Sequence, residues 1–221
     1  MSASAAPIDL DEPFAARLRA QTQAAHTRAE SADFMSELMG GKGSVDGYAA
    51  LMSQYYFIYD ALERVGETFR QDPVAGAFLN NALLRRRAIA ADLTYLVGDD
   101  WREAITPLDA TLEYVARLET VAARSSAEFV AHHYLRYLGD LSGGQIIRVM
   151  IQRHYAIPDE GLNFLAFPLI PKSKPFKDDY RAALENADWS AAERDGFISE
   201  VDVAYGLNFN LFSQLGAVTA L

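Results

Sequence analysis

Four histidines are the candidate metal ligands in a chain that contains no cysteine: His26, His132, His133 and His154. The lack of thiols excludes disulfides, thiolate nucleophiles, iron–sulfur clusters and cysteine-bound zinc. A carboxylate-bridged di-iron site in a helical bundle needs Glu-x-x-His, and none of the four histidines has a glutamate three residues before it. The His-Glu-x-x-His zinc motif does not occur either. These spacings disfavour a non-heme metal site.

His26 has an acidic residue one helical turn after it, at Glu30. Residues four apart lie on the same face of a helix. A carboxylate in that position can accept the Nδ1–H hydrogen bond and leave Nε2 free to bind a metal. The alternative is a surface His–Glu pair, which is common on helices and is the default interpretation for an isolated pair of this kind.

Three glycines, Gly139, Gly143 and Gly144, lie inside a segment whose pattern is otherwise helical. Each glycine costs a helix about 1 kcal/mol relative to alanine, so a compensating reason is expected. Gly139 and Gly143 share one face, which suits either a close crossing with another helix or a flat ligand resting on bare backbone under a kinked helix. Asp140 is correspondingly either an acid in a crowded, partly apolar place or a carboxylate facing solvent.

Apolar residues recur at spacings of three and four along most of the chain, which predicts helices. Asp9 or Asp11 can cap a first helix that has Pro13 in its first turn. Capping boxes of serine and glutamate at Ser125 and Ser190 mark two later helix starts. The further expected helices cover residues 45–65, 80–96, 107–118, 125–155, 177–186 and 191–217.

Strict alternation, internal repeats and low-complexity stretches are absent from the sequence. The pattern therefore predicts an all-α fold, a single-domain helical bundle of seven to eight helices over residues 13–221. Residues 1–12 are expected to form a loose extension. Residues 162–175 contain three prolines and are expected to form an ordered loop.

The charge balance is acidic, with 20 Lys and Arg against 30 Asp and Glu, a net charge of −10. Such a surface disfavours nucleic acid and anionic lipid as partners. No apolar run approaches the ~18 residues of a membrane span, and the N-terminus lacks the basic and apolar regions of a secretion signal. A cytoplasmic protein without a membrane anchor is expected. The densest basic run, Arg85, Arg86 and Arg87, is either a solvated helix face or a docking patch for an acidic electron donor.

Residues 137–145, Tyr-Leu-Gly-Asp-Leu-Ser-Gly-Gly-Gln, resemble the signature of the heme oxygenases. Residues 26–30, His-Thr-Arg-Ala-Glu, are similar to that family's proximal-histidine segment. Further similar segments follow in the family's order: residues 58–63, 114–118, 176–181 and 207–208, with Phe212. The resemblance extends from residue 14 to residue 216 and is greatest to the soluble bacterial members, which lack a hydrophobic C-terminal anchor.

The resemblance implies that heme b is both cofactor and substrate, sandwiched between a proximal helix and a kinked distal helix. His26 is then the iron ligand through Nε2, oriented by Glu30. Gly139 and Gly143 lie over the heme with Gly144 beside them, which leaves room for O₂. Asp140 holds water that delivers protons to the oxygen and directs oxidation onto the ring.

The same resemblance implies roles for two further groups of residues. The polar network behind Asp140 comprises Tyr59, Tyr114, Arg136 and Asn208. A clamp for the heme propionates comprises Arg19, Tyr134, Lys177 and Arg181, while Phe212 contacts the heme. For the first group, the alternative is a buried polar cluster that only fixes helix packing. For the cations of the second group, the alternative is that each is a separate, solvated surface charge. His132 and His133 adjoin the distal helix face and are expected to be structural.

The implied activity is the cleavage of heme by O₂ to biliverdin, as the α isomer, with release of Fe²⁺ and CO. Because no Gly-x-Gly-x-x-Gly fingerprint occurs, electrons must come from a separate ferredoxin or flavin-dependent reductase. A monomer is expected, and iron acquisition is the usual purpose in bacterial relatives. Two alternatives use a similar helical scaffold. One is a heme carrier or sensor, and the other is a thiaminase-like enzyme, whose usual cysteine nucleophile is missing.

Overall fold

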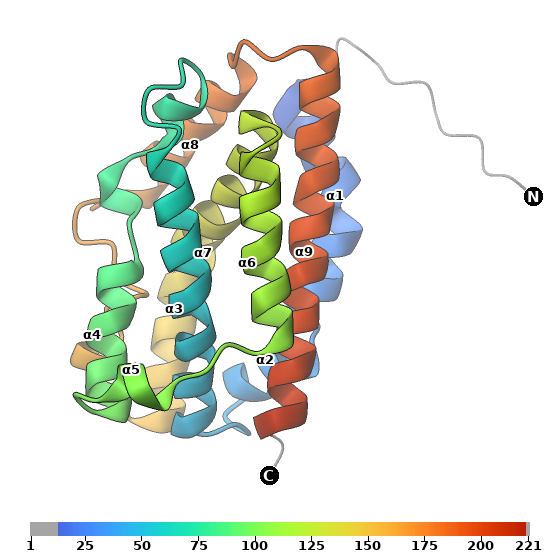
Figure 1. The fold of residues 1–221 in the computed structure, drawn as a ribbon. Helices are drawn as coiled ribbons and strands as arrows, with labels where there is room; N and C mark the ends of the chain where they lie inside the picture. The colour runs from blue at the N-terminus through green and yellow to red at the C-terminus, as the bar shows by residue number, and fades with distance from the viewer. Residues whose placement is uncertain (1–12, 220–221) are drawn as a thin grey trace, which may run out of the picture.

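The computed structural model describes residues 13–219, apart from the side chain of Glu30, and this part of the chain contains helices and no strands (Figure 1). The expected all-α class is therefore confirmed. The proposed caps Asp9 and Asp11 and the whole of the predicted extension, residues 1–12, lie outside the described residues. The α-helices are α1 (Phe14–Glu30), α2 (Asp33–Met39), α3 (Val45–Glu67), α4 (Arg86–Val97), α5 (Trp101–Ala104), α6 (Asp109–Ala122), α7 (Ser126–Tyr155), α8 (Ser173–Glu185) and α9 (Ala191–Thr219).

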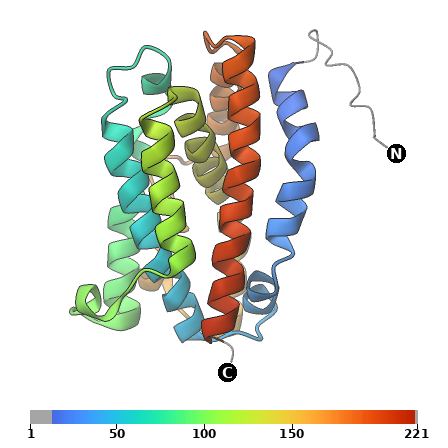
Figure 2. The ribbon, with the colours of Figure 1, turned by 45° about the vertical axis from the view of Figure 1, so that its right-hand side comes forward.

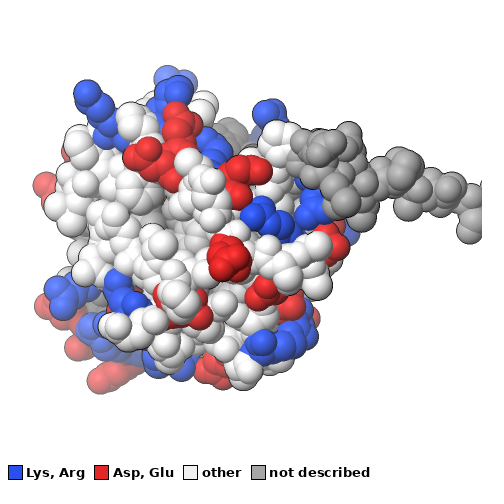
Figure 3. All heavy atoms as spheres, turned by 90° about the horizontal axis from the view of Figure 1, so that it is seen from above, with Lys and Arg blue, Asp and Glu red and all other residues white. Residues whose placement is uncertain are grey.

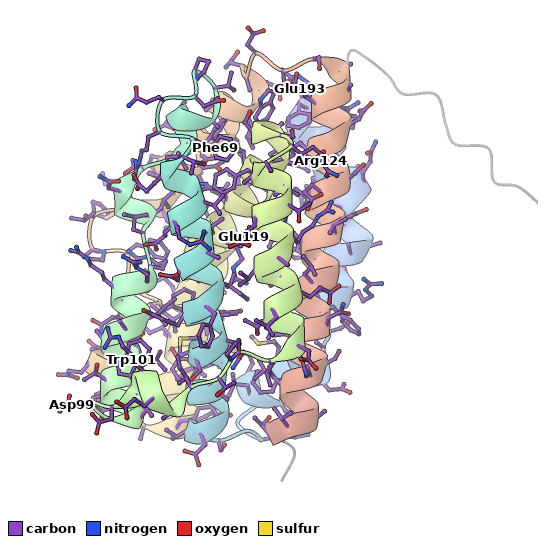
Figure 4. All side chains as sticks on the ribbon, in the orientation of Figure 1. Phe69, Asp99, Trp101, Glu119, Arg124 and Glu193 are labelled. Carbon is purple, nitrogen blue, oxygen red and sulfur yellow. The ribbon has the colours of Figure 1, made fainter. Side chains whose placement is uncertain are left out.

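All seven regions expected to be helical contain a helix, and residues 13–219 add two short ones, α2 and α5. Helix α2 follows α1 after a two-residue break and buries Phe34 and Leu38. Helix α5 is a single turn whose Trp101 is buried and meets the ring of Tyr56 edge-on at 4.7 Å. Trp101 lies at the end of the bundle opposite Glu193, which stands at the start of α9 (Figure 4). Both extra helices are held by tertiary packing, which a local pattern does not encode.

The predicted capping serines act as expected. The Ser125 hydroxyl accepts a hydrogen bond from the Glu128 amide at the start of α7. Ser190 and Glu193 form a reciprocal capping box at the start of α9. Helix α7 then continues without a break to Tyr155, where Ala156 adopts a left-handed conformation with φ of 53°. The segment with the three glycines is therefore part of one long helix.

Two helix starts differ from expectation. Helix α4 begins at Arg86, because the preceding residues form two short 3₁₀ helices, η1 (Ala75–Phe78) and η2 (Asn81–Leu83). The Asn80 side chain accepts a hydrogen bond from the Ala82 amide and holds η2 in that tighter turn. Helix α8 begins at Ser173, four residues before the expected start. The loop before it contains η3 (Asp159–Gly161) and buries several apolar side chains, so it is ordered as predicted.

Helix α9 is the centre of the packing, with α1, α6 and α7 along its length. Helix α3 packs against α4 and α6 on the other side of the bundle, and α2 reaches α9 and α7 near one end. Figures 1 and 2 both show α1 beside α9, with α3 and α4 on the far side of α6. This arrangement leaves α1, α2, α3, α7 and α9 around a common interior.

The basic run at the start of α4 is not a uniform surface patch. Arg85 is buried, donates hydrogen bonds to the carbonyl oxygens of Leu83 and Ala166, and stacks over the Phe167 ring with its Cζ 4.0 Å from the centroid. Arg86 pairs with Asp60 at 2.7 Å. The prediction of three solvated charges is therefore wrong for Arg85, which instead fixes the loop after η3 to the bundle.

The surface of residues 13–219 carries mixed charges, and Figure 3 shows acidic and basic side chains interspersed on the upper face. Several form ion pairs between helices, such as Arg64 on α3 with Glu119 on α6 at 2.7 Å. Glu119 lies between these two helices in Figure 4. Within the same residues, every helix is too short or too polar to traverse a lipid bilayer.

One carboxylate inside the bundle, Glu200 of α9, joins three helices. It accepts hydrogen bonds from Arg117 of α6 and from His132 Nε2 of α7, the latter at 2.8 Å. Burial alone would raise the pKa of Glu200, but these two donors outweigh it and lower the pKa to about 2. Burial also lowers the pKa of His132, so its ring is neutral and Nε2–H is the donor. His132 thus has the structural role expected of it.

We predict that Glu200→Gln lowers the free energy of unfolding by about 2 kcal/mol near neutral pH, because a charged hydrogen-bonded group is lost. The folded pKa of Glu200 lies below its ordinary value of 4.5, so its stabilisation is present above that pH and disappears as the pH falls toward about 2. Urea unfolding at a series of pH values should therefore show the two proteins converging in acid. The exposed Glu119→Gln variant is the control and should change little. A pH-independent difference would contradict the assignment.

Candidate functional site

A cavity of about 570 Å³ lies between α1, α2, α3, α7, α9 and the loop that follows η3. Its size is within the range of about 300–1,000 Å³ that is typical of small-molecule sites. Apolar side chains provide most of the lining, including Leu51 and Met52 of α3 and Phe164 of the loop. The cavity also holds a few polar groups, as ligand sites commonly do. These polar groups are His26, Tyr48, Tyr55, Arg136, Asp140, Tyr205 and Asn208, with two serines.

His26 is half-buried on α1 and lines this cavity. Its ring meets the Tyr205 ring of α9 edge-on, with 5.3 Å between centroids. The aromatic contact restricts the orientation of the imidazole. The Glu30 side chain lies outside the described residues, so its role in orienting His26 remains a prediction.

Two glycines of α7, Gly139 and Gly143, leave part of the cavity wall without side chains. A Cβ atom placed on Gly139 would have no neighbour within 4 Å, and one on Gly143 would meet only Ile147 Cδ1, at 3.6 Å. Neither glycine is pressed against another helix, so a close helix crossing does not explain them. Gly144 differs, because it is buried and its Cβ would lie 3.5 Å from the carbonyl oxygen of Leu165.

Asp140 is held by a chain of hydrogen bonds that joins α3, α7 and α9. The Tyr59 hydroxyl donates to Asp140 Oδ2, and Arg136 Nε donates to the same hydroxyl at 3.2 Å. Arg136 Nη1 donates in turn to Asn208 Oδ1 at 2.8 Å. The structure therefore brings together four of the residues that the sequence suggested for one network, beside the bare glycine surface.

Burial sets the electrostatics of this chain. Burial raises the pKa of Asp140, while the Arg136 guanidinium and the hydrogen bond from Tyr59 oppose that shift. For Arg136, burial alone would lower the pKa, but Tyr59, Tyr55 and Asp140 reverse the effect and raise it well above its ordinary range. Arg136 therefore remains charged, and Asp140 binds a proton more readily than an exposed aspartate does.

Tyr114, the fifth member of the predicted network, is placed differently. It is fully buried on α6, and among the described residues its hydroxyl has no hydrogen-bond partner. It does not line the cavity, and its ring lies 5.5 Å from that of His132. A buried hydroxyl in this position is usually satisfied by ordered water.

Two tyrosines that line the cavity, Tyr48 and Tyr55, were not predicted as site residues. The Arg136 guanidinium stacks over the Tyr55 ring, with its Cζ 4.2 Å from the centroid. Tyr48 is almost fully buried, and its hydroxyl has no hydrogen-bond partner among the described residues. Both follow the helical spacing of core residues, so nothing in the sequence distinguished them from the core. Tyr55 lies one helical turn and Tyr48 three turns before Tyr59 in the sequence. This shared helix face is the signal that could have indicated them as site residues.

The residues predicted to clamp the propionates lie outside the cavity wall. Burial raises the pKa of Tyr134 of α7, and the charges of Arg181 of α8 and Arg19 of α1 oppose that rise. Lys177 Nζ donates to the Ser142 hydroxyl on α7 at 3.1 Å. Lys177 of α8 thus lies beside the glycine-containing part of α7. Phe212, predicted as a contact, does line the cavity.

Over residues 13–219, the fold and the cavity together define a helical protein with a large pocket, bounded by an imidazole, a bare helix face and a partly buried acid. Comparison with known proteins identifies the class. The heme oxygenase family model matches residues 12–214, so the chain belongs to the heme oxygenase family, and it is an enzyme. The resemblance seen in the sequence is thereby confirmed.

Relatives and solved structures agree with this assignment. Heme oxygenase 1 of Rattus norvegicus is 36% identical over 212 residues, which cover 95% of this chain and 73% of the rat protein. The heme oxygenase of Guillardia theta is 32% identical, covering 91% and 86% of the two chains. The structure of heme oxygenase-1 from the cyanobacterium Synechocystis in complex with heme has a TM-score of 0.90 at 31% identity and covers 95% of both chains. The enzyme of Leptospira interrogans has a TM-score of 0.88 at 31% identity, covering 92% and 100%.

We predict that Gly139→Ala raises the free energy of unfolding of the ligand-free protein by up to about 1 kcal/mol, because alanine favours the helix and its methyl group meets nothing. The same change should weaken binding of hemin, since the methyl group enters the cavity. Gly196→Ala in α9 is the control, with ordinary contacts for its Cβ and no place in the cavity lining. Urea unfolding and hemin titration measure the two effects. Destabilisation by Gly139→Ala would mean that this part of α7 is packed after all.

Proposed function

We propose that this protein binds heme in the α1–α7 cavity and cleaves it with O₂ to biliverdin, Fe²⁺ and CO. The observation that carries the proposal is that His26, the bare backbone at Gly139 and the partly buried acid Asp140 line one cavity. By resemblance, we assign cleavage to the α position of the ring and the electron supply to a ferredoxin or flavin-dependent reductase. The relatives named above as heme oxygenases support the activity.

The residues present fit a heme. The cavity is mainly apolar and of suitable volume, as a planar porphyrin requires. The open face over Gly139 and Gly143 accepts a flat surface without displacing a side chain. His26 supplies the kind of neutral nitrogen ligand that iron accepts from histidine in heme proteins.

When bound, heme supplies the iron that activates O₂ and the ring that is oxidised. The protein's own residues then position the heme and supply a proton. His26 binds the iron and is oriented by its contact with Tyr205. Gly139 leaves space for a small molecule next to the ring. Asp140, fixed by Tyr59, holds a proton at its carboxyl group beside that space, while Arg136 keeps Tyr59 in place.

A clamp for the heme propionates is the second part of the proposal. The chain carries a net charge of −10, so two carboxylates of a ligand need local cations to be bound. Lys177 of α8 bonds the Ser142 hydroxyl in the glycine-containing part of α7, and the charges of Arg181 and Arg19 act on Tyr134 of the same helix. We infer that they hold the propionates at the rim of the cavity, with one heme per monomer.

The single experiment that tests the function is an anaerobic hemin titration followed by a reductant and air, with chromatographic identification of the products. Growth of biliverdin absorbance and release of CO are expected. Stable hemin binding without biliverdin would instead indicate a heme carrier or sensor. The fixed acid favours the enzyme, because a carrier has no use for a buried proton donor beside its ligand.

Replacing the acid separates binding from chemistry. We predict that Asp140→Ala retains hemin affinity but slows biliverdin formation by about 10²-fold or more, the usual contribution of a general acid. Tyr59→Phe should have a smaller effect, because it removes only the group that positions the carboxyl. Single-turnover absorbance measurements of all three proteins provide the comparison. Undiminished biliverdin formation by Asp140→Ala would show that the acid is unnecessary.

Replacing the ligand tests the iron site. We predict that His26→Ala loses the histidine-type absorption spectrum of the ferric heme complex, and that added imidazole restores it. His154→Ala is the control, because this exposed histidine does not line the cavity. A spectrum unchanged by His26→Ala would assign the iron to another residue.

A further inference from the structure

An acid of α4, Asp92, has no part in the site described above. Its side chain is fully buried and does not line the α1–α7 cavity. Oδ1 accepts a hydrogen bond from the backbone N–H of Asn163 at 2.6 Å and another from Nδ2 of the same residue at 2.9 Å. Oδ2 accepts one from the backbone N–H of Phe164 at 2.7 Å. Both oxygens of the carboxyl group are therefore bonded to two consecutive residues of the loop that follows η3.

Arg85 holds the same part of the loop from the carbonyl side. Its Nη1 donates to the carbonyl oxygens of Phe164, at 3.5 Å, and of Ala166. Phe164 is buried and lies outside any helix, so no helical neighbour pairs with its backbone groups. Buried backbone groups without a partner are costly. Asp92 and Arg85 supply these partners, one for the N–H group and one for the carbonyl group.

The Phe164 side chain is part of the cavity wall, as is that of the next residue, Leu165. The Phe164 ring lies 5.4 Å from the Tyr59 ring and 5.5 Å from the Tyr55 ring, measured between centroids. Tyr59 is the residue whose hydroxyl bonds Asp140. A shift of the loop backbone would therefore move one wall of the cavity and remove a neighbour that holds Tyr59 in place.

We propose that Asp92, acting with Arg85, is a positioning residue for the α1–α7 cavity. By bonding two N–H groups of the loop, it keeps the Phe164 ring against Tyr59 and fixes how a flat ligand lies relative to Asp140. The consequence for the products rests on the proposed function, because a ring held in one orientation is oxidised at one position, whereas a ring that can turn is oxidised at several. The alternative is that Asp92 only stabilises the fold.

Asp92→Asn changes the hydrogen bonding with little change of shape. A carboxylate accepts hydrogen bonds at both oxygens, whereas an amide has one accepting oxygen and an NH₂ group that only donates. In Asp92→Asn, the N–H of either Asn163 or Phe164 therefore faces another donor and loses its partner. Glu200→Gln is the matched control, because it makes the same change at another buried carboxyl group, which lies outside the cavity lining and bonds other helices instead of the loop.

The first measurement uses the ligand-free protein and needs no turnover. Nuclear Overhauser contacts between the ring protons of Phe164 and Tyr59 report whether the two rings touch, and their absence in Phe164→Leu assigns them. We expect the contact in the unmodified protein and in Glu200→Gln. In Asp92→Asn it should weaken severalfold, because the loop loses one of its holds and the signal falls steeply with distance.

The second measurement is a single turnover with hemin, a reductant and air, followed by chromatographic separation of the biliverdin isomers. We expect Asp92→Asn to slow biliverdin formation about tenfold and to raise the combined share of the minor isomers severalfold, because a misplacement of about 1 Å is enough to disturb a positioned reaction. Glu200→Gln should yield the isomers of the unmodified protein, although both variants lower the free energy of unfolding in urea.

Arg85→Met keeps the length of the side chain but removes its donors, and it should act in the same direction as Asp92→Asn. It is the second variant, should Asp92→Asn not fold. An unchanged ring contact or an unchanged isomer composition in Asp92→Asn, or in Arg85→Met where that variant takes its place, would overturn the positioning proposal.

A shift of isomers in Glu200→Gln as large as that in Asp92→Asn would also overturn it, since the effect would then come from lost stability. Absence of biliverdin from the unmodified protein would overturn the proposed function instead. In that case the ring contact in the ligand-free protein still decides whether Asp92 holds the loop.

Discussion

Keeping a carboxyl group inside a helical bundle, next to a surface that must stay open, is the constraint on which this structure depends. A carboxyl group that is shielded from water costs free energy unless it is hydrogen-bonded, so the partly buried Asp140 requires partners. Tyr59 and Arg136 provide them from α3 and α7, and Asn208 fixes Arg136 from α9. The same three helices surround the cavity, so the network that stabilises the acid also sets the shape of the site.

The glycines of α7 are tolerated because the rest of the helix is strongly anchored. Each of them weakens the helix by about 1 kcal/mol relative to alanine. Against this, α7 is capped by Ser125 and packs along α9, and its first half buries Phe129 and Tyr137. The flanking parts of α7 thus stabilise its glycine-containing segment, and one helix supplies both the rigid frame and the bare surface.

Much of the fold and the site could be predicted because the signals are local. Helical spacing and serine caps located the seven main helices, whereas the glycine run left a close helix crossing and a bare ligand surface as alternatives until the family resemblance favoured the second. What the sequence did not reveal depends on contacts between distant segments. Arg85 was predicted to be solvated, yet it is buried against Phe167, about eighty residues later. Tyr55 has the spacing of a core residue, and only the fold places Arg136 above its ring.

The glycine run itself combines two physical roles that the sequence cannot separate. Gly139 borders open space, so its lack of a side chain serves the ligand. Gly144 is buried beside the carbonyl oxygen of Leu165, so its lack of a side chain lets the loop approach α7. Gly144 and Leu165 both line the α1–α7 cavity, so this approach forms part of its wall. A single short motif therefore determines both where a flat ligand can lie and how closely the loop packs against α7, which ties the binding surface and the position of the loop to one stretch of backbone.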